Sequence, residues 1–320
     1  MNLSSLKICF LCPQGGPHPA HKPWIESLSN FTNIKVIHIP RRIPYRLLLG
    51  YNITLSKRYD LAIVDGFTPS PMGWFMKKIG SCKKLAFITT SPAYMRFPRL
   101  FNFFLKDTDF IIATSSLTSS TIQKLFNFDD RQIAICYPIP DVSNFLKVKP
   151  SLDSQKISFL GSLIYTKGTD LLPKIITKVR TKLKEAELYV IGSGRLSEVE
   201  GMKVFGFVPR DEELLLLSKC SVYVHPARFE AFGASVVEAM AAGLIPIVTE
   251  MTGSKDLVVQ VDPSLIVPVN VDAISEKIIE VLSISINEKK VLSEKAKRIA
   301  AEWSVKVRRE FPRKIIEHLR

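Results

Sequence analysis

The chain has 320 residues, which is enough for two domains of ordinary size that each bury a core. It contains no run of about 18 apolar residues, so no transmembrane helix is expected. Its first residues lack the small-residue cleavage site of a secretory signal. Its five cysteines are scattered through apolar segments, which is typical of reduced thiols in a cytosolic protein. We therefore expect a cytoplasmic protein, peripheral on the cytoplasmic membrane face if it contacts a membrane.

The formal net charge is +14, and its distribution is uneven. Residues 1–150 carry +11, whereas residues 151–320 carry +3. A basic first half indicates an anionic partner or an anionic surface. Segments 41–50 and 94–106 mix arginine with leucine and phenylalanine, as a membrane-surface segment would, although the same aromatics could be core residues. No nucleic-acid partner is expected, because the charge is not arranged as in a known recognition module.

Apolar runs alternate with amphipathic segments along the whole chain. In the first half they predict a helix at 118–128 and strands at 6–12, 34–40, 61–66, 84–90, 109–115 and 132–138. In the second half they predict a helix at 234–242 and strands at 155–161, 186–192, 202–207, 221–225, 245–249 and 265–269. This alternation is typical of α/β folds with parallel sheets covered on both faces. The polar segment 141–155 is the expected linker, and Pro312 should break or kink the last helix.

Loops after the strands are where parallel sheets bind ligands. Gly15 and Gly16 follow the first strand and would let the backbone approach a ligand closely. Lys167 precedes Gly168 after the strand at 155–161 and could pair with a diphosphate. The loops GSGRL (192–196) and GFVPRDEEL (206–214) follow the next two strands. Each loop alone is also consistent with an ordinary turn, so their order along the chain is the more informative feature.

Two glutamates flank the loop and helix that follow the strand at 221–225. Glu230 lies in the loop, Gly233 ends it, and Glu238 lies on the helix. The unpaired first-turn N–H groups of such a helix favour an anion. Glu238 could then accept two hydrogen bonds from a ribose, with Glu230 nearer the group beyond the phosphates. The alternative is that both glutamates are exposed and have no ligand.

The motifs GSLIYTKG, LYVIGSGRL, VFGFVPRDEEL and HPARFEAFGASVVEAMAAG, in this order, resemble the C-terminal domain of family-4-type retaining glycosyltransferases (glycosyl transferases group 1). The resemblance implies the GT-B fold, in which two Rossmann-like parallel-sheet domains face each other across a cleft. It implies an N-terminal acceptor-side domain at 1–145 and a C-terminal nucleotide-sugar-binding domain at 146–302. The C-terminal helix, 303–320, is expected to pack back on the N-terminal domain.

Site residues follow from the resemblance by motif position. Glu230 would approach the donor sugar, and Lys167 would stabilise the diphosphate, which makes these two the expected catalytic residues. Glu238 would bind the ribose. The other expected donor-binding residues are Gly16, Ser162, Phe207, Val208, Phe232, Gly233, Ala234 and Ser235.

This chain departs from many relatives at two places. Ser162 stands where many relatives have an arginine, so Lys167 or Arg195 would have to compensate. Thr89, Thr90 and Ser91 stand where many have a histidine near the acceptor. The candidate acceptor-side residues are therefore Thr90, and His18 in the first loop, where His21 also lies.

The expected function is retaining transfer of a sugar, of the hexosyltransferase type, from a nucleotide-diphosphate-sugar to a glycan, lipid-linked or anionic acceptor. The first domain would receive the acceptor in this fold, so its basic charge suggests an anionic one. Neither a cofactor nor a metal is expected, and the nucleotide-sugar is a co-substrate. Asp107 and Asp109 form a D-x-D pattern, but they precede a strand, which is the wrong end of a sheet for a ligand. The alternatives are a GT-B enzyme of other chemistry, such as a sugar-nucleotide epimerase or a phosphorylase, a family member that has lost activity, and a basic nucleic-acid-binding protein.

Overall fold

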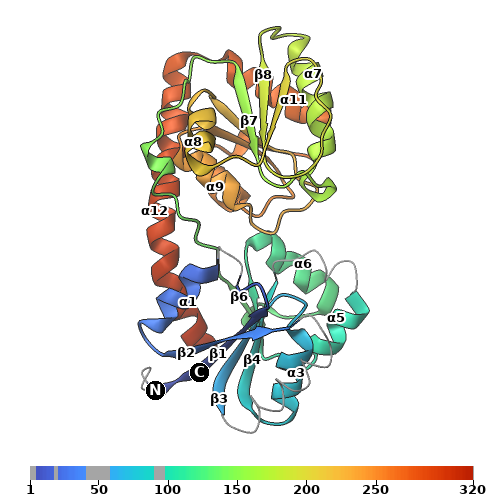
Figure 1. Ribbon diagram of the computed structural model, residues 1–320, viewed down its shortest axis with the longest axis vertical. Helices are drawn as coiled ribbons and strands as arrows, with labels where there is room; N and C mark the ends of the chain where they lie inside the picture. Colours follow the sequence, from blue (N-terminus) through green and yellow to red (C-terminus); the bar gives the residue numbers. More distant parts are fainter. Residues whose placement is uncertain (1–4, 18–20, 41–57, 90–97, 320) are drawn as a thin grey trace. The chain divides into compact units, whose positions relative to one another are not determined.

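The computed structural model describes residues 5–17, 21–40, 58–89 and 98–319. The chain forms two compact units, each built on a parallel sheet with helices (Figure 1). The first unit comprises Met1–Ile139 and Lys306–Arg320, and the second comprises Pro140–Val305. The divisions therefore lie at 139/140 and 305/306 rather than at the expected 145/146 and 302/303.

The sheet of the first unit has six parallel strands in the order β2-β1-β3-β4-β5-β6. Each strand lies within or beside a predicted apolar run, and side chains such as those of Phe10, Ile63 and Phe87 are fully buried. The strands are β1 (Lys7–Pro13), β2 (Asn33–Ile39), β3 (Tyr59–Asp65), β4 (Cys82–Thr89), β5 (Phe110–Ala113) and β6 (Ile133–Ile135). The helices include α1 (Lys22–Ser29), α3 (Ser70–Lys78), α5 (Pro98–Leu105) and α6 (Ser116–Phe126).

The sheet of the second unit also has six parallel strands, in the order β12-β11-β10-β7-β8-β9. The strands are β7 (Lys156–Leu160), β8 (Glu187–Ile191), β9 (Met202–Gly206), β10 (Val222–His225), β11 (Ile245–Thr249) and β12 (Ile266–Val267). The helices are α7 (Leu172–Arg180), α8 (Arg210–Ser218), α9 (Ala234–Ala241), α10 (Lys255–Val261), α11 (Val271–Ser283) and the first part of α12 (Ile286–Leu319). The two parallel sheets confirm the predicted α/β class.

The expected linker is part of the second unit. Within 141–155, the short 3-10 helix η4 (Phe145–Lys147) contributes Phe145, whose ring is 1% exposed. The guanidinium of Arg210 lies 4.7 Å from the centre of this ring. The polar composition of the segment therefore concealed one core residue that attaches it to α8.

Helix α12 continues through Pro312 instead of breaking there. A proline has no N–H to donate to the carbonyl four residues earlier, which here belongs to Arg308. The hydroxyl of Ser27 on α1 donates to that carbonyl at 2.7 Å. Phe311 stacks on Trp24, with ring centres 4.6 Å apart, and Lys314 Nζ donates to the carbonyl of Ile135. Contacts with the rest of the first unit therefore supply a hydrogen-bond donor to the Arg308 carbonyl and fix the end of α12.

The strand order of each sheet contains one point at which the chain reverses its direction of travel across the sheet. In the second unit the chain runs from β7 to β9 on one side and from β10 to β12 on the other, so this point lies between β7 and β10. In the first unit it lies between β1 and β3. Ligands of open parallel sheets bind outside the carboxyl ends of the strands at such points.

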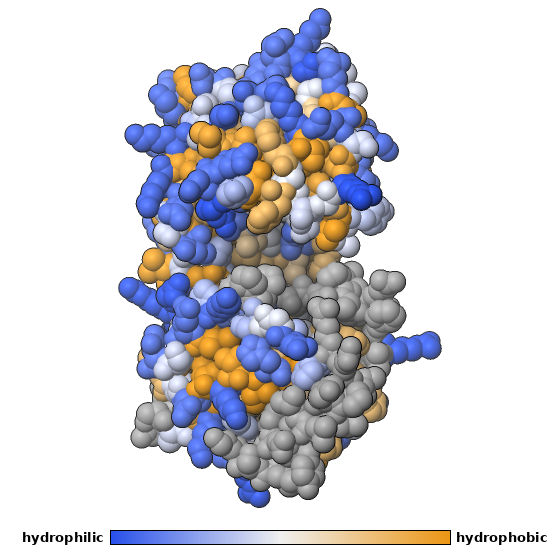
Figure 2. All heavy atoms as spheres, viewed as in Figure 1, coloured by the Kyte–Doolittle hydropathy of each residue, from blue (hydrophilic) through white to orange (hydrophobic). Residues whose placement is uncertain are grey.

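The visible surface is mixed in character. Figure 2 shows hydrophilic side chains over much of the viewed face, with apolar side chains gathered in patches on both units. Among the described residues, no helix has both the length and the apolar character needed to cross a membrane. The five cysteines are all buried free thiols.

Candidate active site

Two of the predicted residues meet at the reversal point of the second sheet. Lys167 ends the 3-10 helix η5 (Tyr165–Lys167) in the loop after β7, and Glu230 lies in the loop after β10. Lys167 Nζ lies 3.1 Å from Glu230 Oε2, and the two side chains are 23% and 17% exposed. The structure therefore brings together the two residues that were predicted to be catalytic.

Backbone contacts fix the Lys167 loop against the Glu230 loop. Gly168 has a φ of +67°, and a Cβ at this position would lie 1.9 Å from the carbonyl oxygen of Pro226. The backbone N–H groups of Arg228 and Phe229 both donate to the carbonyl of Thr166. A side chain at position 168 would separate the loops, which is the physical reason for the glycine in the K-G motif.

The loop after β8 contacts the loop after β7 in the same way. A Cβ on Gly192, whose φ is +145°, would lie 1.8 Å from the carbonyl oxygen of Gly161. Leu163 pairs with Gly194 in an isolated parallel bridge. Ser162 and Arg195 each lie next to one of these paired residues, and both are exposed. The segment that contains Ser162 therefore adjoins a segment that carries an arginine.

A fourth loop, which follows β11, holds the backbone of Glu230. Glu230 N–H donates to the carbonyl of Met251, and Gly253 N–H donates to the carbonyl of Glu230, both at 2.9 Å. Ser254 N–H donates to the carbonyl of Phe232 at 2.6 Å. This loop was not predicted from the sequence as part of the site. Its position after the predicted strand at 245–249 was the available signal.

Helix α9 presents an uncapped N-terminus at the end of the Glu230 loop. Gly233 precedes the helix with a φ of +89°, and no side chain caps the first turn. No acidic residue lies in that turn. Phe232 is buried, whereas Ala234 and Ser235 are partly exposed. The N–H groups at such a helix start and the helix dipole favour an anion, and anion binding here stays a prediction.

Glu238 lies further along α9 and is partly exposed. Burial raises the pKa of Glu238 to about 7, although the charge of Arg210 opposes this shift. Arg210 is itself engaged by Glu213, with Nη1 2.6 Å from Oε1. Glu238 is therefore poised between its neutral and ionised forms near neutral pH.

Glu230 has the opposite electrostatic character. Burial alone would raise its pKa, but hydrogen bonding to His225 and the charge of Lys167 outweigh burial and lower the pKa of Glu230 to about 2. His225 ends β10, is fully buried, and was not identified from the sequence. Burial lowers the pKa of His225, so its imidazole is neutral at pH 7.

The loop predicted to flank the nucleotide base follows β9. Phe207 is 85% exposed and Val208 is 8% exposed, so the first side chain extends into solvent while the second belongs to the core. Helix α8 begins directly afterwards at Arg210, with Asp211, Glu212 and Glu213 in its first turn. The role of the Phe207 and Val208 backbone in flanking the base remains a prediction.

In the first unit, the corresponding reversal point carries a histidine and an aspartate. His21 Nδ1 lies 3.1 Å from both carboxylate oxygens of Asp65, and both side chains are buried. Gly16 lies in the loop after β1, has a φ of +95° and donates its N–H to the carbonyl of Pro13. His18 and Thr90 lie outside the described residues. Asp65, the last residue of β3, was missed although it ends a predicted strand.

The D-x-D residues take part in surface ion pairs instead. Asp107 Oδ1 lies 2.7 Å from Lys78 Nζ, and Asp109 Oδ2 lies 2.8 Å from Lys77 Nζ. Both aspartates precede β5 and therefore lie at the edge of the sheet opposite to the ligand edge, as the sequence predicted. Within the described part of the chain, no group of three or more His, Cys, Asp or Glu is arranged to hold a metal ion.

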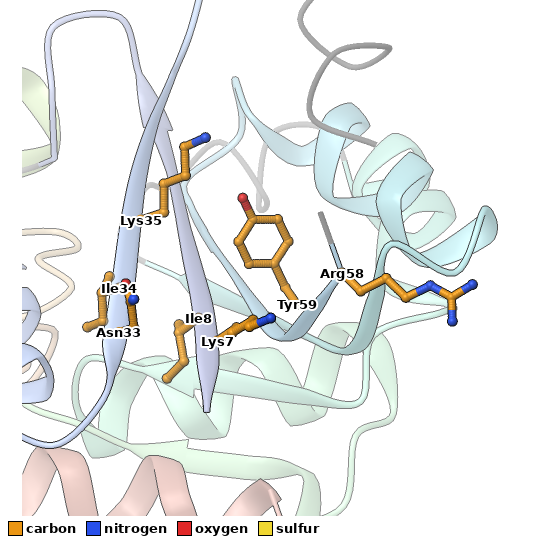
Figure 3. Close-up of a pocket in the computed structure, with 7 residues that line it drawn as sticks. All are labelled: Lys7, Ile8, Asn33, Ile34, Lys35, Arg58 and Tyr59. Carbon is orange, nitrogen blue, oxygen red and sulfur yellow. The ribbon is translucent and has the colours of Figure 1, made fainter. Parts of the chain in front are cut away.

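A cavity of about 500 Å³ also lies at that opposite edge (Figure 3). The first residues of β1, β2 and β3 line it, including Lys7, Asn33 and Tyr59. Lys35 and Arg58 add two further cations to its lining. Because ligands of parallel sheets bind at the carboxyl ends of strands, this cavity is distinct from the site built around Lys167 and Glu230.

Comparison with known proteins assigns the second unit to a family. Residues 143–299 match the family "Glycosyl transferases group 1". The chain carries a glycosyl transferases group 1 domain. This domain contains the loops after β7, β8, β9, β10 and β11, and thus the Lys167–Glu230 pair.

Two curated relatives resemble part of the chain. The phosphatidylinositol N-acetylglucosaminyltransferase GPI3 subunit of Saccharomyces cerevisiae is 31% identical over 124 residues, which is 35% of this chain and 27% of the relative. The phosphatidyl-myo-inositol mannosyltransferase of Propionibacterium freudenreichii is 35% identical over 89 residues, which is 27% of this chain and 23% of the relative. The aligned part thus spans about a quarter of each of these relatives.

A solved structure resembles almost the whole chain. Anabaena HepE, crystallised with UDP and glucose, superposes with a TM-score of 0.75 at 17% sequence identity, covering 97% of this chain and 99% of HepE. At this level of identity the likeness concerns the fold. With the two parallel sheets, it confirms the predicted GT-B fold class.

Proposed function

We propose that the protein is a retaining, metal-independent glycosyltransferase of the hexosyltransferase type that uses a nucleotide-diphosphate-sugar as donor. The observation that carries the proposal is the convergence of Lys167, Glu230 and the uncapped N-terminus of α9 at the reversal point of one sheet. The glycosyl transferases group 1 match over the same residues supports it. In HepE, UDP and glucose occupy a protein of the same fold.

The site provides positive charge where the leaving diphosphate would develop negative charge. The N–H groups at the start of α9 and the ammonium group of Lys167 would bind the two phosphates, so the site needs no metal for this role. Glu238 would accept hydrogen bonds from the ribose hydroxyls, and Glu230 from the sugar hydroxyls. The diphosphate itself would help to deprotonate the acceptor on the face of the sugar that it leaves, which retains the anomeric configuration.

We propose a lipid-linked or anionic glycan acceptor. The names of the two relatives describe transfer to phosphatidylinositol compounds. The +11 charge of residues 1–150 supports an anionic partner, whereas no described feature supports a nucleic acid. The His21–Asp65 pair lies at the ligand edge of the first sheet and supports an acceptor-side role for this unit.

We propose that the protein is cytoplasmic and lies peripherally on the cytoplasmic face of the membrane. Segment 41–50 lies outside the described residues, but part of segment 94–106 forms α5. Phe103 on α5 is 50% exposed and Phe75 on α3 is 41% exposed, and exposed lysines, Lys106 and Lys78, follow them three positions later in the sequence. Apolar rings bordered by lysines fit an anionic bilayer surface. Phe103→Glu should reduce sedimentation with anionic vesicles, and equal sedimentation of variant and wild type would refute this surface.

The donor half of the proposal is tested by binding and turnover. A panel of nucleotide-sugars should include one that raises the unfolding temperature, because a ligand bound only by the folded state stabilises it. With that donor, Lys167→Ala should reduce turnover about 100-fold. The matched control is Lys174→Ala, since Lys174 is an exposed lysine on α7.

Three outcomes would favour other functions. Conversion of the nucleotide-sugar without any acceptor would indicate an epimerase or another GT-B chemistry. Donor binding without transfer to any acceptor would indicate a member of the family that has lost activity. Salt-sensitive binding to any polyanion, with no nucleotide-sugar affinity, would indicate a nucleic-acid-binding protein. The anomeric configuration of the first product, read by NMR, tests retention directly.

A further inference from the structure

A buried histidine lies directly behind Glu230. His225 is 0% exposed, and its ring stacks on Phe159 with centres 5.8 Å apart. Its Nε2 lies 3.5 Å from Glu230 Oε2, and its Nδ1 lies 3.1 Å from the hydroxyl oxygen of Tyr223. A polar ring with one partner on each side is therefore enclosed in the core beneath the donor site.

The surroundings determine which ring nitrogen carries the proton. A carboxylate has no proton to donate, so the nitrogen that faces Glu230 must carry an N–H. Nδ1 then accepts from the hydroxyl of Tyr223. The titratable groups that face His225 are Tyr223 on β10, Glu230 after β10 and Lys167 after β7, with Glu238 on α9 acting on Tyr223. Lys167 is the cation of this group, and it contacts the same carboxylate as His225.

Tyr223 connects this ring to the proposed diphosphate site. Its hydroxyl oxygen lies 2.9 Å from Ser235 Oγ, in the first turn of α9. It also lies 3.2 Å from the carbonyl oxygen of Leu160, the last residue of β7. The three elements that build the donor site, which are the ends of β7 and β10 and the start of α9, therefore meet at one buried hydroxyl.

The two oxygens of Glu230 are consequently not equivalent. Lys167 and His225 both contact Oε2, at 3.1 and 3.5 Å. Among the described residues, none contacts Oε1 within hydrogen-bonding distance. A carboxylate held through one oxygen presents the other in a fixed direction, which is what recognition of a sugar hydroxyl requires.

We propose that His225 is a positioning residue that holds Oε2 of Glu230 so that Oε1 accepts a hydrogen bond from a hydroxyl of the donor sugar. Through Tyr223 it also fixes this carboxylate relative to the first turn of α9. The inference rests on the proposed function and deepens it, because it assigns recognition of the sugar, as distinct from the nucleotide, to a buried residue.

Two amide substitutions separate the two sides of the imidazole. In His225→Gln the side-chain amide can reach the position of Nε2 and donate to Glu230. In His225→Asn the shorter amide reaches only the position of Nδ1, so the contact with Tyr223 is kept and the donor to Glu230 is lost. The pair is matched in polarity and differs in which contact survives.

The decisive measurement compares a nucleotide-sugar with its nucleoside diphosphate by calorimetry. His225→Asn should weaken nucleotide-sugar affinity about tenfold, since the N–H that faces the charged carboxylate is lost, and should leave nucleoside diphosphate affinity within about twofold of wild type. His225→Gln should recover most of the nucleotide-sugar affinity. Equal losses for both ligands would show a merely structural role, and wild-type affinity of His225→Asn for the nucleotide-sugar would also overturn the proposal.

A second measurement needs no donor. In protein labelled with ¹³C at the glutamate carboxyl groups, the Glu230 resonance should begin to titrate at a higher pH in His225→Asn than in wild type, and His225→Gln should resemble wild type. An unchanged Glu230 titration in His225→Asn would refute the contact itself. If the wild type bound no nucleotide-sugar, the proposed function would fail, and this titration would still decide whether His225 holds Glu230.

Discussion

Replacing Glu238 with glutamine should remove a pH dependence from the stability of the second unit. Burial raises the pKa of this carboxyl group to about 7 in the fold, from an ordinary value of 4.5. In the unfolded chain the group therefore ionises first, and the folded state is penalised as the pH rises from 4.5 towards 7. Glutamine has a similar shape and does not titrate, so the penalty disappears.

The size of the effect follows from the two pKa values. Between pH 5 and pH 8, a shift from 4.5 to about 7 removes about 2.5 kcal/mol from the free energy of unfolding. For a unit of this size, each kcal/mol corresponds to roughly 2 to 4 °C in unfolding temperature. The wild type should therefore lose about 5 to 10 °C more than Glu238→Gln over this pH range.

Thermal unfolding of the two proteins at a series of pH values measures this difference directly. Other groups also titrate, so the informative quantity is the wild-type curve minus the variant curve. Glu212→Gln, at an exposed position on α8, serves as the control and should run parallel to the wild type. Parallel curves for wild type and Glu238→Gln would refute the reasoning that burial keeps this carboxyl group partly neutral.

Three further changes test contacts in the two units. Gly168→Ala should destabilise the second unit by more than about 3 kcal/mol in urea unfolding, because the added Cβ would meet a backbone carbonyl at 1.9 Å. Gly206→Ala, with a φ of +71° but open space, is the control and should cost about 1 to 2 kcal/mol; equal losses would contradict the clash. The pKa of Glu230 is lowered from 4.5 to about 2 in the fold, so its ionised carboxylate stabilises the folded state at pH values above 4.5. About 2 kcal/mol of this contribution should be lost between pH 5 and pH 3 in the wild type but not in Glu230→Gln. Urea unfolding midpoints at the two pH values will show or exclude this difference. Ser27→Ala should cost the first unit about 1 to 2 kcal/mol, while Ser29→Ala, whose exposed hydroxyl bonds only within its own helix, should be nearly neutral; similar unfolding midpoints for both would contradict the role of Ser27.

The strands were predictable because buried parallel strands are continuous apolar runs. The predicted run at 245–249 is β11 itself, and that at 84–90 contains most of β4. The meeting of Lys167 and Glu230 was predictable in outline, since both follow strands that end at one edge of a sheet. Their 3.1 Å contact was not predictable, because it depends on the close packing of the Lys167 loop against the Glu230 loop that Gly168 permits.

The missed features all depend on partners distant in the sequence. Asp65 ends a predicted strand, yet only its contact with His21, 44 residues earlier, makes it a site candidate. His225 belongs to a predicted buried strand, and its contact with Glu230 depends on the fold of the loop that follows β10. Pro312 predicted a helix break because a proline cannot donate to the carbonyl four residues earlier. Ser27, 281 residues from Arg308 in the sequence, donates to that carbonyl instead.

This last contact has a consequence for the order in which the chain can fold during synthesis. The second unit is one continuous segment, Pro140–Val305, so all of its residues are available before Lys306–Arg320 are made. The first unit includes Lys306–Arg320, and Phe311 and Ile315 from that segment are buried in its core. Residues up to Ile139 are synthesised before Lys306–Arg320, so α1 lacks its partner until that later segment has emerged from the ribosome. Of the two units, the one whose synthesis begins first is therefore the one that is completed later.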